Sequence, residues 1–230
     1  DRVQVYSGAN GRLLRSLTSG RRFDEIGTAM VALPDLDGDG VGEIAAGASG
    51  RWAQPVPGRV HVFSGASGAL LRTLSGPDRP MDKFGFSLAV VGDLDGDGVV
   101  DLAISCLDGG GAAGENTGAV YVMSLADGHV LATLSGPAPH HLFGHEIAAV
   151  PDVDGNGRPE LLVGAFLPDG IGYARVVDPL TGHVHAELRG TETGDGFGHA
   201  VGVVGDVDGD GTADWAIGAP DARDPASGYA

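Results

Sequence analysis

The stretch Phe84–Asp101, which reads FGFSLAVVGDLDGDGVVD, recurs three more times along the chain without a gap. The related stretches are Ile26–Glu43, Phe143–Glu160 and Phe197–Asp214. Their starts lie 58, 59 and 54 residues apart. Eighteen aligned positions that recur four times at this spacing indicate a tandem repeat, and a repeat of this length is typical of stacked structural units.

Each repeat predicts four short antiparallel strands. In the second repeat the first strand, Leu88–Val91, precedes an acidic run and the second strand, Leu102–Ser105, follows it. The third strand shows period-two alternation around Val120 and Val122, and the fourth is Val130–Leu134. Four such strands joined by glycine-rich turns in a unit of this size are typical of a β-propeller blade.

The two ends of the chain carry complementary halves of the repeat. Val3–Ser7 and Leu13–Leu17 match the third and fourth strands, whereas Val201–Val204 and Trp215–Ile217 match the first and second. Pairing these halves would close a four-bladed ring by a two-plus-two blade and remove the open sheet edges. A piece of a larger propeller, and an exchange of half-blades between two chains, are the alternatives.

The predicted fold is therefore all-β, a single β-propeller domain over residues 1–230. Its expected parts are a half-blade at 1–25, blades at 26–83, 84–142 and 143–196, and a half-blade at 197–230.

An acidic loop with the pattern D-x-D-G-[DN]-G-x-x-[DE] follows the first strand of every repeat. Acidic or amide side chains at loop positions 1, 3, 5 and 9 can converge on one point, and Ca²⁺ prefers six to eight such hard oxygen ligands. A backbone carbonyl at position 7 is expected to add one more ligand. The predicted calcium ligands are Asp35, Asp37, Asp39, Val41 and Glu43; Asp93, Asp95, Asp97, Val99 and Asp101; Asp152, Asp154, Asn156, Arg158 and Glu160; and Asp206, Asp208, Asp210, Thr212 and Asp214.

These loops are not EF-hands, because an EF-hand requires a bidentate Glu at position 12 and flanking helices. Position 12 is apolar in every repeat: Ala46, Ile104, Val163 and Ile217. Simple solvated turns are the alternative, but a turn has no need of a third and fourth carboxylate, which would repel one another. We expect about four Ca²⁺ per chain, with the third loop weakest because Asn156 removes one charge.

The composition excludes several classes of protein. The chain has 230 residues, 42% of them hydrophobic, and a net charge of −17, which argues against nucleic-acid binding. The sequence has no run of 18 uncharged apolar residues, so it predicts no membrane span. The single Cys106 excludes an internal disulfide framework and is expected to be a small buried side chain. No recognisable catalytic motif is present, so no catalytic residue is predicted.

The repeat, with its leading F-G, acidic loop and closing I-G-A-P, resembles the FG-GAP repeat of integrin α-subunit β-propellers and their bacterial relatives. The last repeat is the fullest match, with Phe197–Gly198 and Ile217–Pro220, whereas the first has Ile26 in place of Phe and Ser49 in place of Pro. The resemblance implies structural calcium, an extracellular or cell-surface location, and ligand recognition by loops. The leading hypothesis is a non-catalytic, calcium-binding adhesion module.

A partner, either a protein or a glycan, is expected on the face opposite the acidic loops. The most variable connections are predicted there, and Arg51 and Trp52 are the candidate partner-binding residues because Arg and Trp are common interface anchors.

The alternative is a carbohydrate-active enzyme on a propeller scaffold. Its candidate groups would be the loop residues Asp78, Arg79, Glu115, His140 and His141. The two adjacent histidines, together with His145, are also a candidate transition-metal site. For His145 and His199, which follow Phe-Gly in two repeats, packing at the rim of the core is the leading interpretation.

Overall fold

The computed structural model describes residues 1–50, 56–76, 82–108, 116–167 and 169–220. These residues form sixteen β-strands and no helix, which confirms the predicted all-β class. Among them, accordingly, there is no helix long and apolar enough to cross a membrane.

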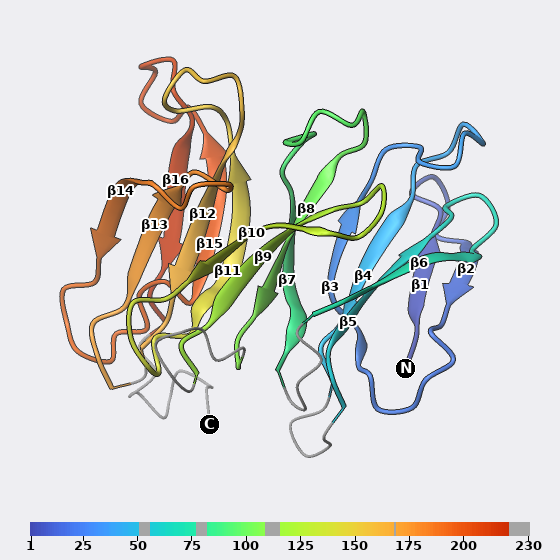
Figure 1. Ribbon diagram of the computed structural model, residues 1–230, viewed down its shortest axis with the longest axis horizontal. Coiled ribbons are helices and arrows are strands. Elements are labelled where there is room, and N and C mark those ends of the chain that lie inside the picture. Colours follow the sequence, from blue (N-terminus) through green and yellow to red (C-terminus); the bar gives the residue numbers. More distant parts are fainter. Residues whose placement is uncertain (51–55, 77–81, 109–115, 168, 221–230) are drawn as a thin grey trace.

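Three four-stranded antiparallel sheets stand side by side in chain order (Figure 1). In each sheet the four strands follow one another without a crossover, as in a propeller blade. The first sheet contains β3 (Ile26–Ala32), β4 (Ile44–Ala48), β5 (Arg59–Phe63) and β6 (Leu70–Ser75). The second contains β7 (Phe84–Val90), β8 (Asp101–Cys106), β9 (Ala119–Ser124) and β10 (Val130–Ser135). The third contains β11 (Phe143–Val150), β12 (Glu160–Ala165), β13 (Tyr173–Val177) and β14 (Val184–Arg189).

Two further sheets have only two strands each. One pairs β1 (Val3–Tyr6) with β2 (Leu13–Leu17), and the other pairs β15 (Ala200–Gly205) with β16 (Asp214–Gly218). The first corresponds to the outer half of a blade and the second to the inner half, as the sequence predicted.

Among the described residues the two half-blades do not pair with each other, so the predicted two-plus-two closure within one chain is not confirmed. They are separate sheets: β1 and β2 lie on the right in Figure 1, whereas β15 and β16 lie on the left, where they overlap the strands of the third sheet in this view. Each packs on its neighbouring four-stranded sheet: Val3 and Leu17 belong to the same buried cluster as Ile26, whereas Trp215 packs against the cluster that contains Val150. The first strands β3, β7, β11 and β15 line one common cavity, so the described sheets are arranged around an axis, although β1 and β16 are not hydrogen-bonded to each other.

The core lies between neighbouring sheets. The first strands of successive repeats, β3, β7, β11 and β15, contact one another in that order. The second strands β8 and β12 are buried at every residue, because they are covered by a sheet on each face. This layer holds the acidic loops, since each loop joins a first strand to a second strand.

The F-G pair at the start of β7 shows why the repeat requires these two residues. The Phe84 side chain is fully buried between sheets. Gly85 has φ of 87°, and a Cβ there would lie 2.6 Å from the carbonyl oxygen of Arg59 in the preceding sheet. Glycine therefore permits both the left-handed backbone and the close approach of two sheets.

The acidic loops share one side of the molecule with the turns between third and fourth strands. The Ser64 hydroxyl donates to Asp39 Oδ2 at 3.5 Å, and the Ser124 hydroxyl donates to Asp97 Oδ2 at 3.3 Å. The loops lie along the upper edge of the view in Figure 1. The first and second acidic loops are therefore each bordered by a hairpin that is distant from the loop in sequence.

Candidate metal centres

The first aspartate of each loop closes the turn by accepting backbone amides. Asp93 Oδ1 accepts from Gly96 N at 2.7 Å and Asp97 N at 3.1 Å, while its Oδ2 accepts from Gly98 N at 2.9 Å. Three backbone donors on one carboxylate fix its position in the turn. The same bonds are made by Asp35, Asp152 and Asp206, and there these amides, the position 6 glycine first, lower the pKa.

The acidic side chains at positions 3 and 5 are arranged by the same turn. Asp95 Oδ1 accepts from Asp97 N at 3.1 Å, and Asp97 Oδ1 accepts from Val99 N at 2.8 Å. In each of these carboxylates the loop backbone bonds only to Oδ1. The Oδ2 atom of Asp97 also accepts the Ser124 hydroxyl. Gly96 and Gly98, with φ of 81° and 88°, allow the tight curvature.

In the first three loops the acid at position 9 is buried at the start of the second strand, whereas Asp214 of the fourth loop is half-buried. Glu43 is 1% exposed, and Asp101 and Glu160 are 0% exposed. One oxygen of each accepts the amide of loop position 2, for example Leu94 N to Asp101 Oδ2 at 2.7 Å. The other oxygen, Glu43 Oε1, Asp101 Oδ1 or Glu160 Oε1, is buried and has no hydrogen-bond partner among the described residues.

Burial without a counter-charge changes the acidity of these groups. Desolvation is the largest cause, and it raises the pKa of Asp101 to about 6 and also raises the pKa of Glu43 and Glu160. The nearby loop aspartates add to this effect in all three loops. Each of these buried oxygens lacks a hydrogen-bond donor and lies near other carboxylates. A bound cation would compensate both.

Acidic side chains converge in each loop. Ligand atoms within 4.8 Å of one another come from Asp35, Asp37, Asp39 and Glu43 in the first loop, from Asp93, Asp95 and Asp101 in the second, and from Asp206, Asp208 and Asp210 in the fourth. In the third loop the group is Asp154, Glu160 and His185. The predicted ligands Asp97, Asp152 and Asp214 lie in the same loops but contribute no atom to these groups.

This donor set fits Ca²⁺. All the side-chain donors of the first, second and fourth groups are carboxylate oxygens, the ligand type that Ca²⁺ prefers, and the loop backbone fixes their positions. The carbonyl of loop position 7 stays a prediction, as does the occupancy of each loop. His185 was not expected as a neighbour of the third loop, because it lies on a different hairpin, 25 residues after Glu160.

The other candidate groups behave as packing residues. His145 Nδ1 lies 2.8 Å from the carbonyl oxygen of His199, and the His145 ring packs against those of Phe86, Phe166 and His199. Burial lowers the pKa of His145. The interpretation of this position as the rim of the core is therefore confirmed.

The candidate transition-metal site of His140, His141 and His145 does not assemble among the described residues. His141 contacts Tyr173 instead, with 3.3 Å between Nδ1 and the phenol oxygen. Cys106 is fully buried and donates to the carbonyl of Asp82 at 3.1 Å, as expected for a small core side chain.

The predicted partner-binding residues Arg51 and Trp52 lie outside the described residues. The same is true of Asp78, Arg79 and Glu115, which belong to the enzyme alternative.

Comparison with known proteins identifies similar chains among integrin α subunits. The chain is 32% identical to Xenopus laevis integrin alpha-4 over 161 residues, which is 65% of this chain and 15% of that protein. It is 33% identical to Mus musculus integrin alpha-3 over 154 residues, 59% of this chain and 14% of that protein. It is 27% identical to Gallus gallus integrin alpha-V over 183 residues, 71% of this chain and 17% of that protein. No family model matches the chain.

These matches confirm the resemblance to an integrin α-like, FG-GAP-type propeller. The chain spans about a seventh of the length of the relatives that it matches. The similarity therefore concerns the repeat region.

Proposed function

We propose that the chain is a non-catalytic binding module of the adhesion type, located outside the cytoplasm or on a cell surface, whose blades are stabilised by Ca²⁺. The acidic loops supply the calcium sites, and the connections on the opposite face contact a partner. The similarity to integrin α subunits supports the adhesion-type propeller and argues against an enzyme.

The observation that carries the proposal is a set of three buried carboxylate oxygens, one each on Glu43, Asp101 and Glu160, that have no hydrogen-bond partner in the part of the chain that the structure describes. Leaving such an oxygen unpaired in the folded state costs about 1–3 kcal/mol, and more when the group is charged. A cation in the loop would remove this cost and the repulsion between neighbouring carboxylates. The cation-bound loops would then stabilise the pairing of the first and second strands in each blade.

The magnitude of the effect matters for a domain of this kind. Extracellular calcium modules have Kd values of about 10⁻⁴–10⁻³ M. At a tenfold excess of Ca²⁺ over Kd each site would add about 1.4 kcal/mol to the free energy of unfolding. Four sites would supply a large part of the roughly 5–15 kcal/mol that stabilises a typical domain.

Calcium binding is tested by isothermal titration of the wild type, Asp101→Asn and the control Asp127→Asn. Asp127 is an exposed acid on the hairpin beside the second loop, where it pairs with His129 at 2.6 Å. We expect Asp101→Asn to lose one calcium site and Asp127→Asn to keep the wild-type number. Equal calcium numbers for all three proteins would contradict the assignment of the position 9 acid.

Partner binding is tested with immobilised chain against purified extracellular-matrix proteins and a glycan array, with Ca²⁺ and with a chelator. We expect binding that depends on Ca²⁺, that is reduced in an Arg51→Ala/Trp52→Ala variant, and that leaves the ligand chemically unchanged. Cleavage of a glycan by the calcium-loaded protein would instead favour the enzyme alternative.

A further inference from the structure

The third acidic loop has a different set of neighbours from the other loops. Position 5 is Asn156, where the first two loops have Asp39 and Asp97. The hairpin beside the loop carries Asp178 at the place of Ser64 and Ser124. The fourth strand carries His185, where the first two blades have Leu71 and Leu131. Compared with the first two blades, the third blade therefore has one acid fewer in the loop, one acid more on the adjoining hairpin, and a histidine on the fourth strand.

The position of His185 is set by a β-bulge. Val177 pairs with Val184 and Val176 pairs with Ala186, so His185 is the extra residue between two cross-strand pairs. The bulge recurs in the first blade, where Leu71 is the extra residue between Leu70 and Arg72. A bulge re-aims the side chain that it carries.

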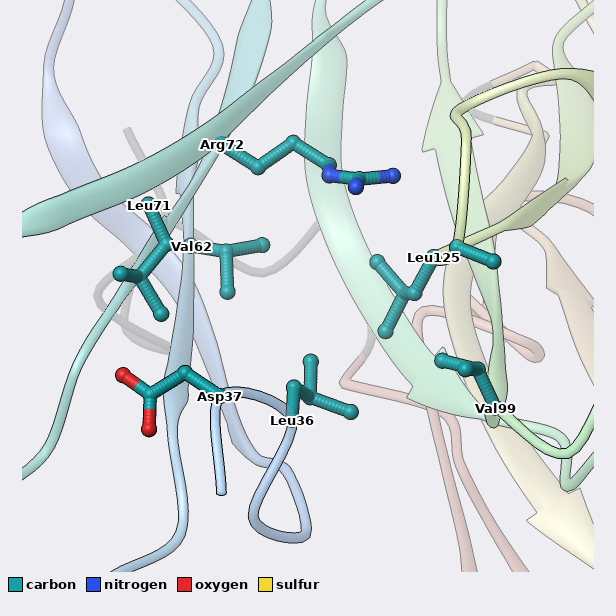
Figure 2. Close-up of a pocket in the computed structure, with 8 residues that line it drawn as sticks. Leu36, Asp37, Val62, Leu71, Arg72, Val99 and Leu125 are labelled. Atoms are coloured by element: carbon teal, nitrogen blue, oxygen red, sulfur yellow. The ribbon is translucent and has the colours of Figure 1, made fainter. Parts of the chain in front are cut away.

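The side chain at this bulge faces the acidic loop. In the first blade Leu71 and Asp37 line one cavity, of about 280 Å³, and Figure 2 shows both side chains there. In the third blade His185 Nε2 lies 3.9 Å from Asp154 Oδ2, and Asp154 holds the same loop position as Asp37. The substitution of histidine for leucine therefore places a nitrogen donor at the loop.

Two donors in this group are buried and lack partners. Glu160 is fully buried, and its Oε1 has no hydrogen-bond partner among the described residues, while its Oε2 accepts from Val153 N at 2.7 Å. His185 Nε2 is likewise buried without a hydrogen-bond partner. Asp154 Oδ1 accepts from Asn156 N at 2.9 Å, which leaves Oδ2 toward the histidine. One atom each of Glu160, His185 and Asp154 lies within 4.8 Å of the others.

We propose that the third loop is a transition-metal site of the Zn²⁺ class, with His185 Nε2, Glu160 Oε1 and Asp154 Oδ2 as protein ligands. The inference deepens the proposed function, since it rests on the acidic loops being cation sites. Imidazole nitrogen suits Zn²⁺ and related ions, whereas Ca²⁺ takes oxygen ligands. Two ligand atoms at about 2 Å from a tetrahedral Zn²⁺ lie about 3.3 Å apart. The separation of 3.9 Å between Asp154 Oδ2 and His185 Nε2 therefore requires the two side chains to move about 0.6 Å closer when the ion binds.

The second loop offers a matched contrast. His129 Nε2 also lies 3.9 Å from an aspartate oxygen, Asp95 Oδ2. However, the His129 side chain is 51% exposed, its Nδ1 lies 2.6 Å from Asp127, and it contributes no atom to the converging group of that loop. His129→Leu is therefore a control that removes a surface histidine beside an acidic loop without removing a proposed ligand.

The test is a titration of the full chain with Zn²⁺ in buffer saturated with Ca²⁺, and with Co²⁺ followed by visible absorption. The proteins are the wild type, His185→Leu and His129→Leu. Leucine occupies the matching bulge of two other blades, so we expect the variant to fold, and thermal unfolding in Ca²⁺ verifies this. Loss of a metal ligand is expected to weaken Zn²⁺ binding at this site at least about tenfold, the lower end of the effect of losing a mere outer-shell partner.

We expect wild type and His129→Leu to bind Zn²⁺ at one site that His185→Leu loses, together with the Co²⁺ absorption of a nitrogen-ligated ion. Unchanged Zn²⁺ binding in His185→Leu, or no Zn²⁺ bound by the folded wild type, would overturn the inference. The calcium count is measured separately on the same proteins. If the chain binds no Ca²⁺ but binds Zn²⁺ at a site that requires His185, the proposed calcium function is overturned and this inference is supported.

Discussion

In the first three loops the acid at position 9 is the most buried of the acidic side chains. Asp101 is fully buried, has one oxygen without a partner, and has a pKa raised to about 6 by burial. Without a cation this group favours the protonated form. With a cation the ionised form is required, so the same side chain is expected to have opposite effects on stability in the two states.

Asp101→Asn tests this in the chelated protein by urea unfolding between pH 4 and 7. The folded pKa of about 6 exceeds the usual 3.8, so the contribution of Asp101 to the free energy of unfolding is present below about pH 4 and is lost as the pH rises through 6. Asparagine does not titrate. The stability of the variant relative to wild type should therefore increase by about 1–3 kcal/mol from pH 4 to 7.

In Ca²⁺ at pH 7 we expect Asp101→Asn to be less stable than wild type, because the variant lacks one calcium ligand. If the difference in free energy of unfolding between Asp101→Asn and wild type does not change with pH in chelator, the raised pKa of Asp101 is contradicted.

The glycine of the F-G pair makes a second prediction at this scale. Gly85→Ala places a methyl group 2.6 Å from the Arg59 carbonyl oxygen at a φ of 87°. We expect a loss of more than about 2 kcal/mol in urea unfolding, because a left-handed backbone and a clash with another sheet act together. The control Gly20→Ala has φ of 73° and open space around its Cβ, so it should lose only the smaller conformational part. Equal losses would contradict the close sheet packing.

Much of the candidate site could be predicted from residue spacing. Positions 1, 3, 5 and 9 of the second loop, with the glycines Gly96 and Gly98 between them, indicate convergence because these residues are close in sequence. His185 could not be assigned to the third loop in this way. It reaches the loop from a separate hairpin through a β-bulge, and the position of a bulge depends on cross-strand pairing that the sequence pattern does not state. The sequence feature that could have indicated a metal ligand here is the pair of histidines, His183 and His185, two residues apart.

At the scale of the element, the second strand of each repeat is the central support of its blade. Leu102 in β8 is fully buried, whereas Leu70 in the outer strand β6 is 46% exposed. Leu102→Ala should lower the free energy of unfolding by about 2–5 kcal/mol, because it leaves a cavity between two sheets. Leu70→Ala should change it by about 0.5 kcal/mol or less, as for most surface substitutions. Urea unfolding in Ca²⁺ measures both, and similar losses would contradict the layered core.

The order of strands was predictable and the closure was not. The alternation around Val120 and Val122, and the glycine-rich turns, are local signals that fix which strand pairs with the next. The relation of β1 to β16 depends instead on the angle between neighbouring sheets. That angle results from many interdigitated side chains, such as those of Val3 and Ile26, and has no signature in the repeat.

At the scale of the whole molecule, charge and metal are linked. The net charge is −17, and the acidic loops gather carboxylates that repel one another. Four Ca²⁺ would bring the charge to about −9, which would relieve repulsion inside the loops more than across the surface. The repeat units contact mainly their neighbours along the chain, so a cation that fastens one loop is expected to stabilise its own blade and the adjacent interface.

The most direct test of calcium-stabilised blades is thermal unfolding of the chain with Ca²⁺ and with a chelator, alongside the number of Ca²⁺ bound. At roughly 1.4 kcal/mol per site, four sites predict a Tm that is about 10 °C or more higher in Ca²⁺. We expect about four bound Ca²⁺, or three where the third loop holds a transition metal. No bound calcium and an unchanged Tm would contradict the account, because the acidic loops would then be turns that stabilise the blades without a cation.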